Sequence, residues 1–167
     1  MDSPIATVTT EDWAVMGRAA KTTPEAFKKA YEAALEEHPP GPSDHFKLTV
    51  GPVRTVDGCE EHSFDLDLGH AIGLGITVRF CGPVSGDWKA ELEGKLKAAG
   101  MTVWTTTYTL SPSNVGVCWD PHVGVAKAHL CIAIKGDRHC LNIAGEACYW
   151  ALWWRCGNFD ETPICFG

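Results

Sequence analysis

The sequence lacks the features that mark membrane proteins and nucleic-acid-binding proteins. No apolar run approaches the roughly 18 residues that a membrane-spanning helix needs. There is no basic stripe, and 14 Lys and Arg residues are outnumbered by 21 Asp and Glu residues, although binding to a nucleic-acid backbone depends on basic side chains. The 167 residues can fill one core but not two full-sized domains. We therefore expect a soluble globular monomer with no transmembrane segment and no nucleic-acid partner.

Common catalytic and cofactor-binding motifs are missing as well. The chain contains no G-x-S-x-G and no H-E-x-x-H. Gly73-Leu74-Gly75 is not a dinucleotide-binding loop, because it lacks the third glycine and the helix that should follow. No cofactor is predicted, and the sequence leans away from an enzyme.

Cysteine is absent from the first 58 residues and abundant afterwards. The even number of cysteines in one small chain favours a disulfide framework over reduced buried thiols. There is no C-x-x-C, and the spacings do not match a structural zinc site, so no metal is predicted. The eight predicted disulfide cysteines are Cys59, Cys81, Cys118, Cys131, Cys140, Cys148, Cys156 and Cys165.

Disulfides form in oxidising compartments, so we expect a secreted, extracellular protein. The first 20 residues carry no apolar signal region, and we expect Met1 to stand before a mature secreted sequence. One cysteine pair is excluded if residues 142–157 form a continuous helix or strand. Eight residues then span about 12 Å or about 26 Å, which exceeds the reach of about 7 Å between bridged Cα atoms, so Cys148 should not pair with Cys156.

The first 40 residues are predicted to form a helical arm. Thr23-Pro24-Glu25 is a typical helix start, and an apolar stripe with helical spacing follows it. A shorter helix is expected over 12–20, capped by Thr9 or Thr10. Residues 38–44 are rich in proline and predict a stiff linker. The arm is either a removable pro-segment or regulatory arm, or a helical pair that packs against the rest of the protein.

Residues 46–167 are predicted to form a cysteine-rich α+β domain. Apolar residues occupy nearly every even position from Phe64 to Phe80, which indicates a hairpin turning at residues 69–71. A helix is expected from Ser85 to Gly100, and strands over 101–110, 115–119 and 123–134. Residues 142–157 fit a helix, and residues 149–154 within them also fit a strand. The predicted fold is a two-layer α+β sandwich with a mainly antiparallel sheet, stabilised by disulfides, with an N-terminal helical arm.

Two polar loops and one side-chain pair are the candidates for chemistry. If the protein is an enzyme, we expect Asp120 and His122 of one loop to act with His139 of the other. His129 and Cys131 are two residues apart on a predicted strand and share a face, which is the arrangement of a Cys/His nucleophilic pair. A cysteine in a disulfide cannot act as a nucleophile, so structural cystines beside surface histidines are the other interpretation.

The candidate binding residues are Trp150, Trp153 and Trp154. Exposed aromatic side chains anchor many interfaces, so this cluster predicts a platform for a protein or a glycan. The other interpretation is that the three indoles fill the core beside the cystines.

In size and cysteine content, residues 46–167 resemble the small secreted cysteine-rich proteins that fungi use as effectors or killer toxins. The resemblance rests on no shared motif, so it transfers no functional residue. It implies a secreted effector or toxin-like protein that binds a host or competitor molecule. The alternative is a small secreted hydrolase that uses histidine and carboxylate chemistry.

Overall fold

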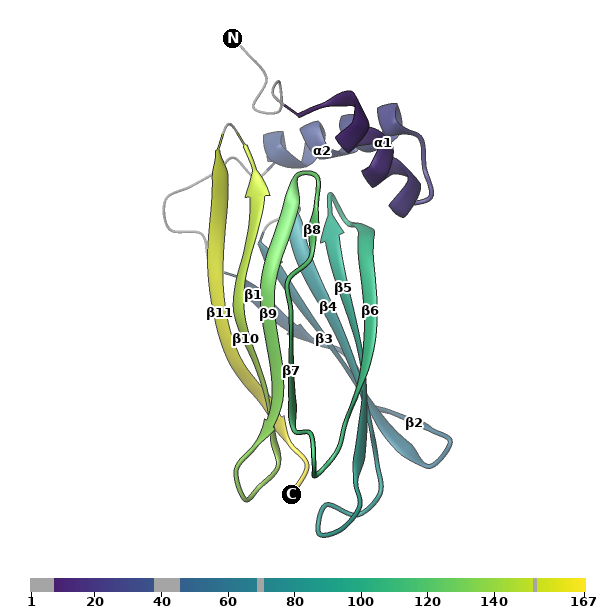
Figure 1. Ribbon diagram of the computed structural model, residues 1–167, viewed down its shortest axis with the longest axis vertical. Coiled ribbons are helices and arrows are strands. Elements are labelled where there is room, and N and C mark those ends of the chain that lie inside the picture. Colours follow the sequence, from purple (N-terminus) through teal and green to yellow (C-terminus); the bar gives the residue numbers. More distant parts are fainter. Residues whose placement is uncertain (1–7, 38–45, 69–70, 152) are drawn as a thin grey trace.

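A computed structural model describes residues 8–37, 46–68, 71–151 and 153–167. In these residues two helices are followed by two antiparallel β-sheets (Figure 1). No helix in this part of the chain is long and apolar enough to cross a membrane. The predicted fold class, α+β with antiparallel sheet structure, four disulfides and a helical N-terminal part, is confirmed.

Both predicted helices form, and their capping residues explain where they begin. Helix α1 (Thr10–Ala19) starts after Thr9, whose side chain accepts a hydrogen bond from the backbone N–H of Asp12. Helix α2 (Pro24–Glu37) starts after Thr23, whose Oγ1 accepts from the N–H of Ala26 at 3.1 Å. The predicted linker 38–44 lies outside the described residues.

The larger sheet contains the predicted hairpin. Its strands are β1 (Lys47–Val50), β2 (Arg54–Val56), β3 (Cys59–Leu68), β4 (Ile72–Cys81), β5 (Lys89–Ala98) and β6 (Met101–Leu110). They are arranged in the order β1-β3-β4-β5-β6, with β2 also paired to β3. Leu68 pairs with Ile72 where the chain reverses, and the even positions of β3 and β4 from Phe64 to Phe80 are buried. Residues 69 and 70 of the turn lie outside the described residues.

The helix predicted from Ser85 to Gly100 is wrong, because this segment is strand β5. Its buried residues, among them Leu92 and Leu96, alternate with charged residues such as Glu93 and Lys95. A spacing of four between apolar residues fits one face of a helix and one face of a strand equally well. Pairing with β4 on one side and β6 on the other satisfies the backbone hydrogen bonds of the segment as a strand.

The smaller sheet holds the C-terminal third of the chain. Its strands are β7 (Gly116–Trp119), β8 (His122–Val123), β9 (Ala126–Lys135), β10 (Cys140–Trp150) and β11 (Trp154–Cys165). They are ordered β11-β10-β9-β7, and β8 pairs with β9. The segment 142–157 is therefore neither one helix nor one strand, because the chain reverses between Trp150 and Trp154.

All four disulfides join residues that lie directly opposite each other on neighbouring strands. They are Cys59–Cys81, Cys118–Cys131, Cys140–Cys165 and Cys148–Cys156. The exclusion of the Cys148–Cys156 pair is wrong. The reversal between β10 and β11 brings these two Cα atoms to 4.1 Å, which no continuous helix or strand allows.

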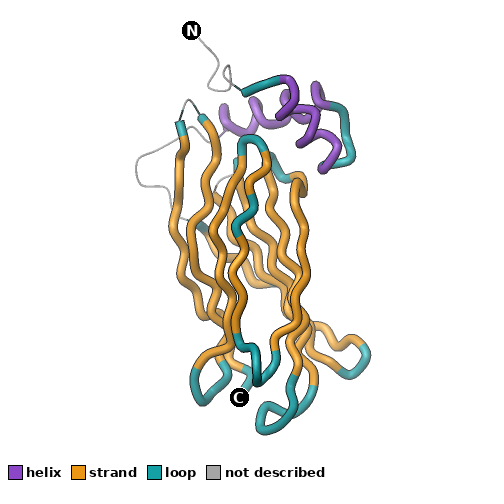
Figure 2. Tube along the Cα trace, viewed as in Figure 1, coloured by secondary structure: helices purple, strands orange, loops and turns teal. Residues whose placement is uncertain are grey.

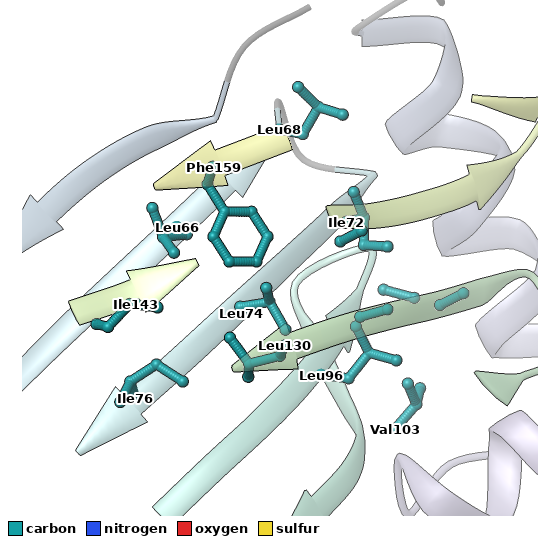
Figure 3. Close-up of a cluster of buried hydrophobic side chains, with 14 of the residues drawn as sticks. Leu66, Leu68, Ile72, Leu74, Ile76, Leu96, Val103, Leu130, Ile143 and Phe159 are labelled. Carbon is teal, nitrogen blue, oxygen red and sulfur yellow. The ribbon is translucent and has the colours of Figure 1, made fainter. Parts of the chain in front are cut away.

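The core lies between the two sheets. Leu74 and Ile76 of the larger sheet face Leu130, Ile143 and Phe159 of the smaller one (Figure 3). All five are nearly or fully inaccessible to solvent. Apolar burial of this kind is the main force that holds two sheets face to face.

The helical arm covers one end of this sandwich (Figure 2). Met16, Phe27 and Tyr31 are fully buried. The Tyr31 hydroxyl donates a hydrogen bond to the carbonyl of Trp150 at 2.9 Å, and the N–H of Val125 approaches Met16 Sδ at 3.4 Å. The arm therefore packs against the cysteine-rich part, and its removal as a pro-segment stays a prediction.

Candidate functional site

The outer face of the smaller sheet gathers several of the candidate residues. Because side chains alternate along a strand, β9 turns Lys127 and His129 outward, and β10 places Glu146 directly opposite His129. With Asp120 and His122 from the chain between β7 and β9, these side chains line a groove of about 280 Å³. The groove therefore combines two imidazoles, two carboxyl groups and one ammonium group.

His129 is held between a carboxylate and a sulfur atom. Its Nδ1 lies 2.5 Å from Oδ1 of Asp120, and its Nε2 lies 3.5 Å from Sγ of Cys131. The sequence correctly placed His129 and Cys131 on one face. Cys131 is bonded to Cys118, however, so the sulfur that faces the imidazole is not a free thiol.

The three candidate tryptophans have different surroundings. Trp153 is 51% exposed, where the chain turns from β10 to β11, and the guanidinium of Arg155 lies 3.9 Å from its ring centroid. Trp154 is partly buried, with Lys127 Nζ 4.2 Å from its ring centroid and the imidazole of His122 in edge contact. Trp150 packs edge-on against Trp154 and contacts the core. Trp153 is thus the exposed member, whereas Trp154 contacts Lys127 and His122 of the groove.

The structure does not bring His139 to this groove. His139 lies in the turn between β9 and β10 and contacts Trp88 at the other end of the sandwich. The eight residue-to-residue steps along β9 from Lys127 to Lys135 alone span about 26 Å. Asp120 and His122 therefore lie in one groove, and His139 lies outside it. The hydrolase alternative stays a prediction, with two of its three proposed residues in the groove.

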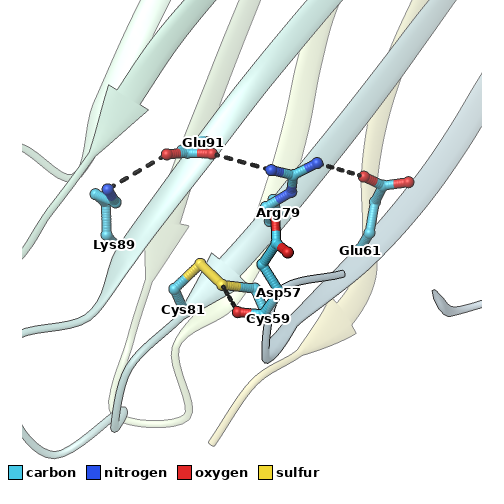
Figure 4. Close-up of a disulfide and its surroundings, with 7 residues drawn as sticks. All are labelled: Asp57, Cys59, Glu61, Arg79, Cys81, Lys89 and Glu91. Atoms are coloured by element: carbon cyan, nitrogen blue, oxygen red, sulfur yellow. Dashed lines mark hydrogen bonds and ion pairs between the residues drawn. A yellow bond between two sulfur atoms is a disulfide. The ribbon is translucent and has the colours of Figure 1, made fainter. Parts of the chain in front are cut away.

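The outer face of the larger sheet carries a second, broader hollow of about 720 Å³. Its charged side chains are engaged with one another. Arg79 lies between Glu61 and Glu91, and Lys89 contacts Glu91 (Figure 4). Arg54 also contacts Glu61. Hydrogen bonds from Arg79 and Arg54 hold the pKa of the Glu61 carboxyl below its usual value, against the opposing effect of burial. Mutual pairing between neighbouring strands explains these charges.

Two groups of side chains in the described part of the chain are close enough together to surround a cation. One is Cys118, His129 and Cys131, and the other is Glu146, Cys148 and Cys156. Each group includes both sulfurs of a disulfide. The thiolate, not the disulfide, is the form that binds metals, so each group is a cystine with a polar neighbour.

Sequence reasoning missed the roles of Lys127 and Glu146. Lys127, His129 and Cys131 occupy every second position of one strand and share a face. A search for a period of two could therefore have found Lys127. Glu146 faces His129 only because of the register between β9 and β10. No local pattern encodes that register.

Comparison of the chain with protein-family models, curated proteins and solved structures finds no match. Function must therefore be argued from the site itself.

Proposed function

We propose that this protein is an extracellular binding protein that attaches to a protein partner through the exposed Trp153 and the Arg155 that stacks on it. Four disulfides in a small β-rich fold are compatible with an extracellular location. The resemblance in size and cysteine content to fungal effectors and killer toxins supports a host or competitor molecule as the partner.

The observation that carries the proposal is the position of Trp153. An indole that is about half exposed at the reversal between two strands can enter a pocket on a partner. Arg155 lies against its ring, and Trp and Arg are two of the residue types that dominate binding energies.

The surroundings of the rings favour a protein over a glycan. A sugar stacks on a free aromatic face, whereas a cation already lies over the ring of Trp153 and another over the ring of Trp154. An indole paired with a guanidinium presents an apolar edge and hydrogen-bond donors together, which suits a protein pocket.

The test is comparative affinity capture from extracellular and cell-surface proteins with the full chain, the Trp153→Ala variant and a Tyr108→Ala control. Tyr108 is also exposed but lies on the larger sheet. We expect the wild type and the control to retain a partner that Trp153→Ala loses. Binding of the purified partner should then weaken by about 30-fold or more, as for a central anchor residue.

Equal capture by all three proteins would contradict the proposal. Capture that disappears after the partner is enzymatically deglycosylated would show that a glycan is bound instead. Thermal unfolding of each variant serves as the folding control, because Trp153 is exposed and its truncation should leave stability nearly unchanged.

A further inference from the structure

Two disulfides on the outer face of the smaller sheet have opposite electrostatic environments. Cys118–Cys131 joins β7 to β9, and Cys148–Cys156 joins β10 to β11. In the first pair Cys118 is exposed and Cys131 is less accessible. In the second pair Cys156 is exposed and Cys148 is buried. The less accessible sulfur of the first pair lies 3.5 Å from Nε2 of His129.

The less accessible sulfur of the second pair, Sγ of Cys148, lies 3.6 Å from a carboxylate oxygen of Glu146. His129 and Glu146 face each other across β9 and β10. The two cystines therefore differ in the group beside the sulfur that would become the leaving thiolate.

We propose that Cys118–Cys131 is a thiol–disulfide exchange site, whose co-substrate is a thiol such as glutathione or an accessible cysteine of another protein. The proposal does not depend on the binding function argued above. It rests on the exposure of Cys118, on the contact between His129 and Cys131, and on the hydrogen bond between Asp120 and His129.

Thiol–disulfide exchange at Cys118–Cys131 takes two steps. The incoming thiolate attacks Sγ of Cys118 and forms a new S–S bond, while the bond between Cys118 and Cys131 breaks. The electron pair of that bond leaves on Sγ of Cys131 as a thiolate, which takes the proton from Nε2 of His129. A second thiolate attacks the incoming sulfur of the mixed disulfide and releases the oxidised thiol and the Cys118 thiolate.

His129 is positioned to assist the leaving sulfur. The bond between Nδ1 and Asp120 fixes the ring so that Nε2 faces Cys131. A neighbouring imidazolium stabilises a thiolate, and a more stable thiolate leaves faster.

The other three cystines lack this arrangement. Attack at the exposed Cys156 would expel the thiolate of Cys148, which is 2% exposed and lies beside a carboxylate. Burial and a neighbouring carboxylate both disfavour a thiolate at Cys148. In Cys59–Cys81 and Cys140–Cys165 neither cysteine is exposed to the extent of Cys118.

The test follows the reduction of each disulfide in the native full chain. The protein is incubated with reduced glutathione, free thiols are alkylated at intervals, and the peptides are quantified by mass spectrometry. We expect Cys118–Cys131 to open first, about tenfold faster than Cys148–Cys156, with glutathione attached to Cys118. His129→Gln should slow that opening by about tenfold and leave the other three rates unchanged.

His139→Gln is the matched control, because it changes a histidine at the far end of the sandwich and should not alter the Cys118–Cys131 rate. Asp120→Asn should slow the opening less than His129→Gln does, and it provides the test if His129→Gln fails to fold. Glu146→Gln should accelerate the opening of Cys148–Cys156. The proposal is overturned if Cys118–Cys131 opens no faster than Cys148–Cys156, or if His129→Gln and His139→Gln give the same rate.

Discussion

Gly145 shows how a single residue supports the candidate site. Its φ of 153° lies in a region that L side chains rarely adopt. A Cβ atom on Gly145 would overlap the backbone carbonyl oxygen of His129. Only glycine therefore allows β10 to approach β9 at the position where His129 is held.

We predict that Gly145→Ala destabilises the protein by about 3 kcal/mol or more, because it combines an unfavourable φ with a backbone collision. Gly136→Ala is the control. Gly136 also has a positive φ, of 76°, but open space surrounds the site of its Cβ, so its replacement should cost about 1 kcal/mol. Chemical denaturation of both variants measures the difference, and equal losses would contradict the predicted collision.

At the scale of the element, α2 is fixed to the sandwich by one polar contact within an apolar interface. Tyr31 is fully buried and donates its hydroxyl proton to the Trp150 carbonyl. Burial raises the pKa of Tyr31 well above its ordinary value of 10.0. The proximity of Tyr149 acts in the same direction, and the hydrogen bond to Trp150 opposes it.

This shift predicts a loss of stability in alkali. In the unfolded chain Tyr31 ionises near pH 10, whereas in the folded protein it remains neutral to a higher pH, so a rise in pH above about 10 favours unfolding. We predict that Tyr31→Phe costs about 1 kcal/mol at neutral pH through the lost hydrogen bond. It should also reduce the decline in the free energy of unfolding between pH 9 and 11.

Urea denaturation at several pH values measures both effects. Tyr108→Phe is the control, because Tyr108 is partly exposed on the larger sheet. An unchanged alkaline decline in Tyr31→Phe would show that other groups cause it.

At the scale of the whole molecule, the disulfides and the core have separate roles. Each of the four disulfides lies within one sheet, and none connects the two sheets. The cystines restrict neighbouring strands, while apolar packing between the sheets and under the helices holds the layers together.

We predict that Ile143→Ala destabilises the protein by about 3 kcal/mol with all four disulfides intact, because it opens a cavity between the sheets. Amide hydrogen exchange should become faster in the larger sheet as well as in the smaller one, since both share the core. Val53→Ala, at a residue that is 58% exposed, should change stability by less than about 0.5 kcal/mol. Faster exchange confined to the smaller sheet would show that the layers unfold independently.

Local rules were sufficient where the information lies within one segment of sequence. The caps Thr9 and Thr23 predicted the two helix starts, because a capping side chain bonds to the backbone of its own first turn. The alternation from Phe64 to Phe80 predicted the central hairpin, because the side chains of a strand point to opposite faces in turn. The even cysteine count predicted disulfides, and all eight cysteines are paired.

Tertiary structure decided what depends on a partner distant in sequence. Trp88, Leu92 and Leu96 satisfy helix and strand periods alike, and pairing of their segment with β4 and β6 made it a strand. The chain reversal after Trp150 allowed Cys148 to reach Cys156.

The groove also depends on contacts between segments that are distant in sequence. The register between β9 and β10 placed Glu146 opposite His129, and the same geometry left His139 at the other end. The sequence alone therefore determined the capped helices, the central hairpin and the disulfide-rich character of the protein. Only the tertiary structure decided the strand partners, the cysteine pairs and the groove, because strand register and chain reversal depend on contacts between segments that are distant in sequence.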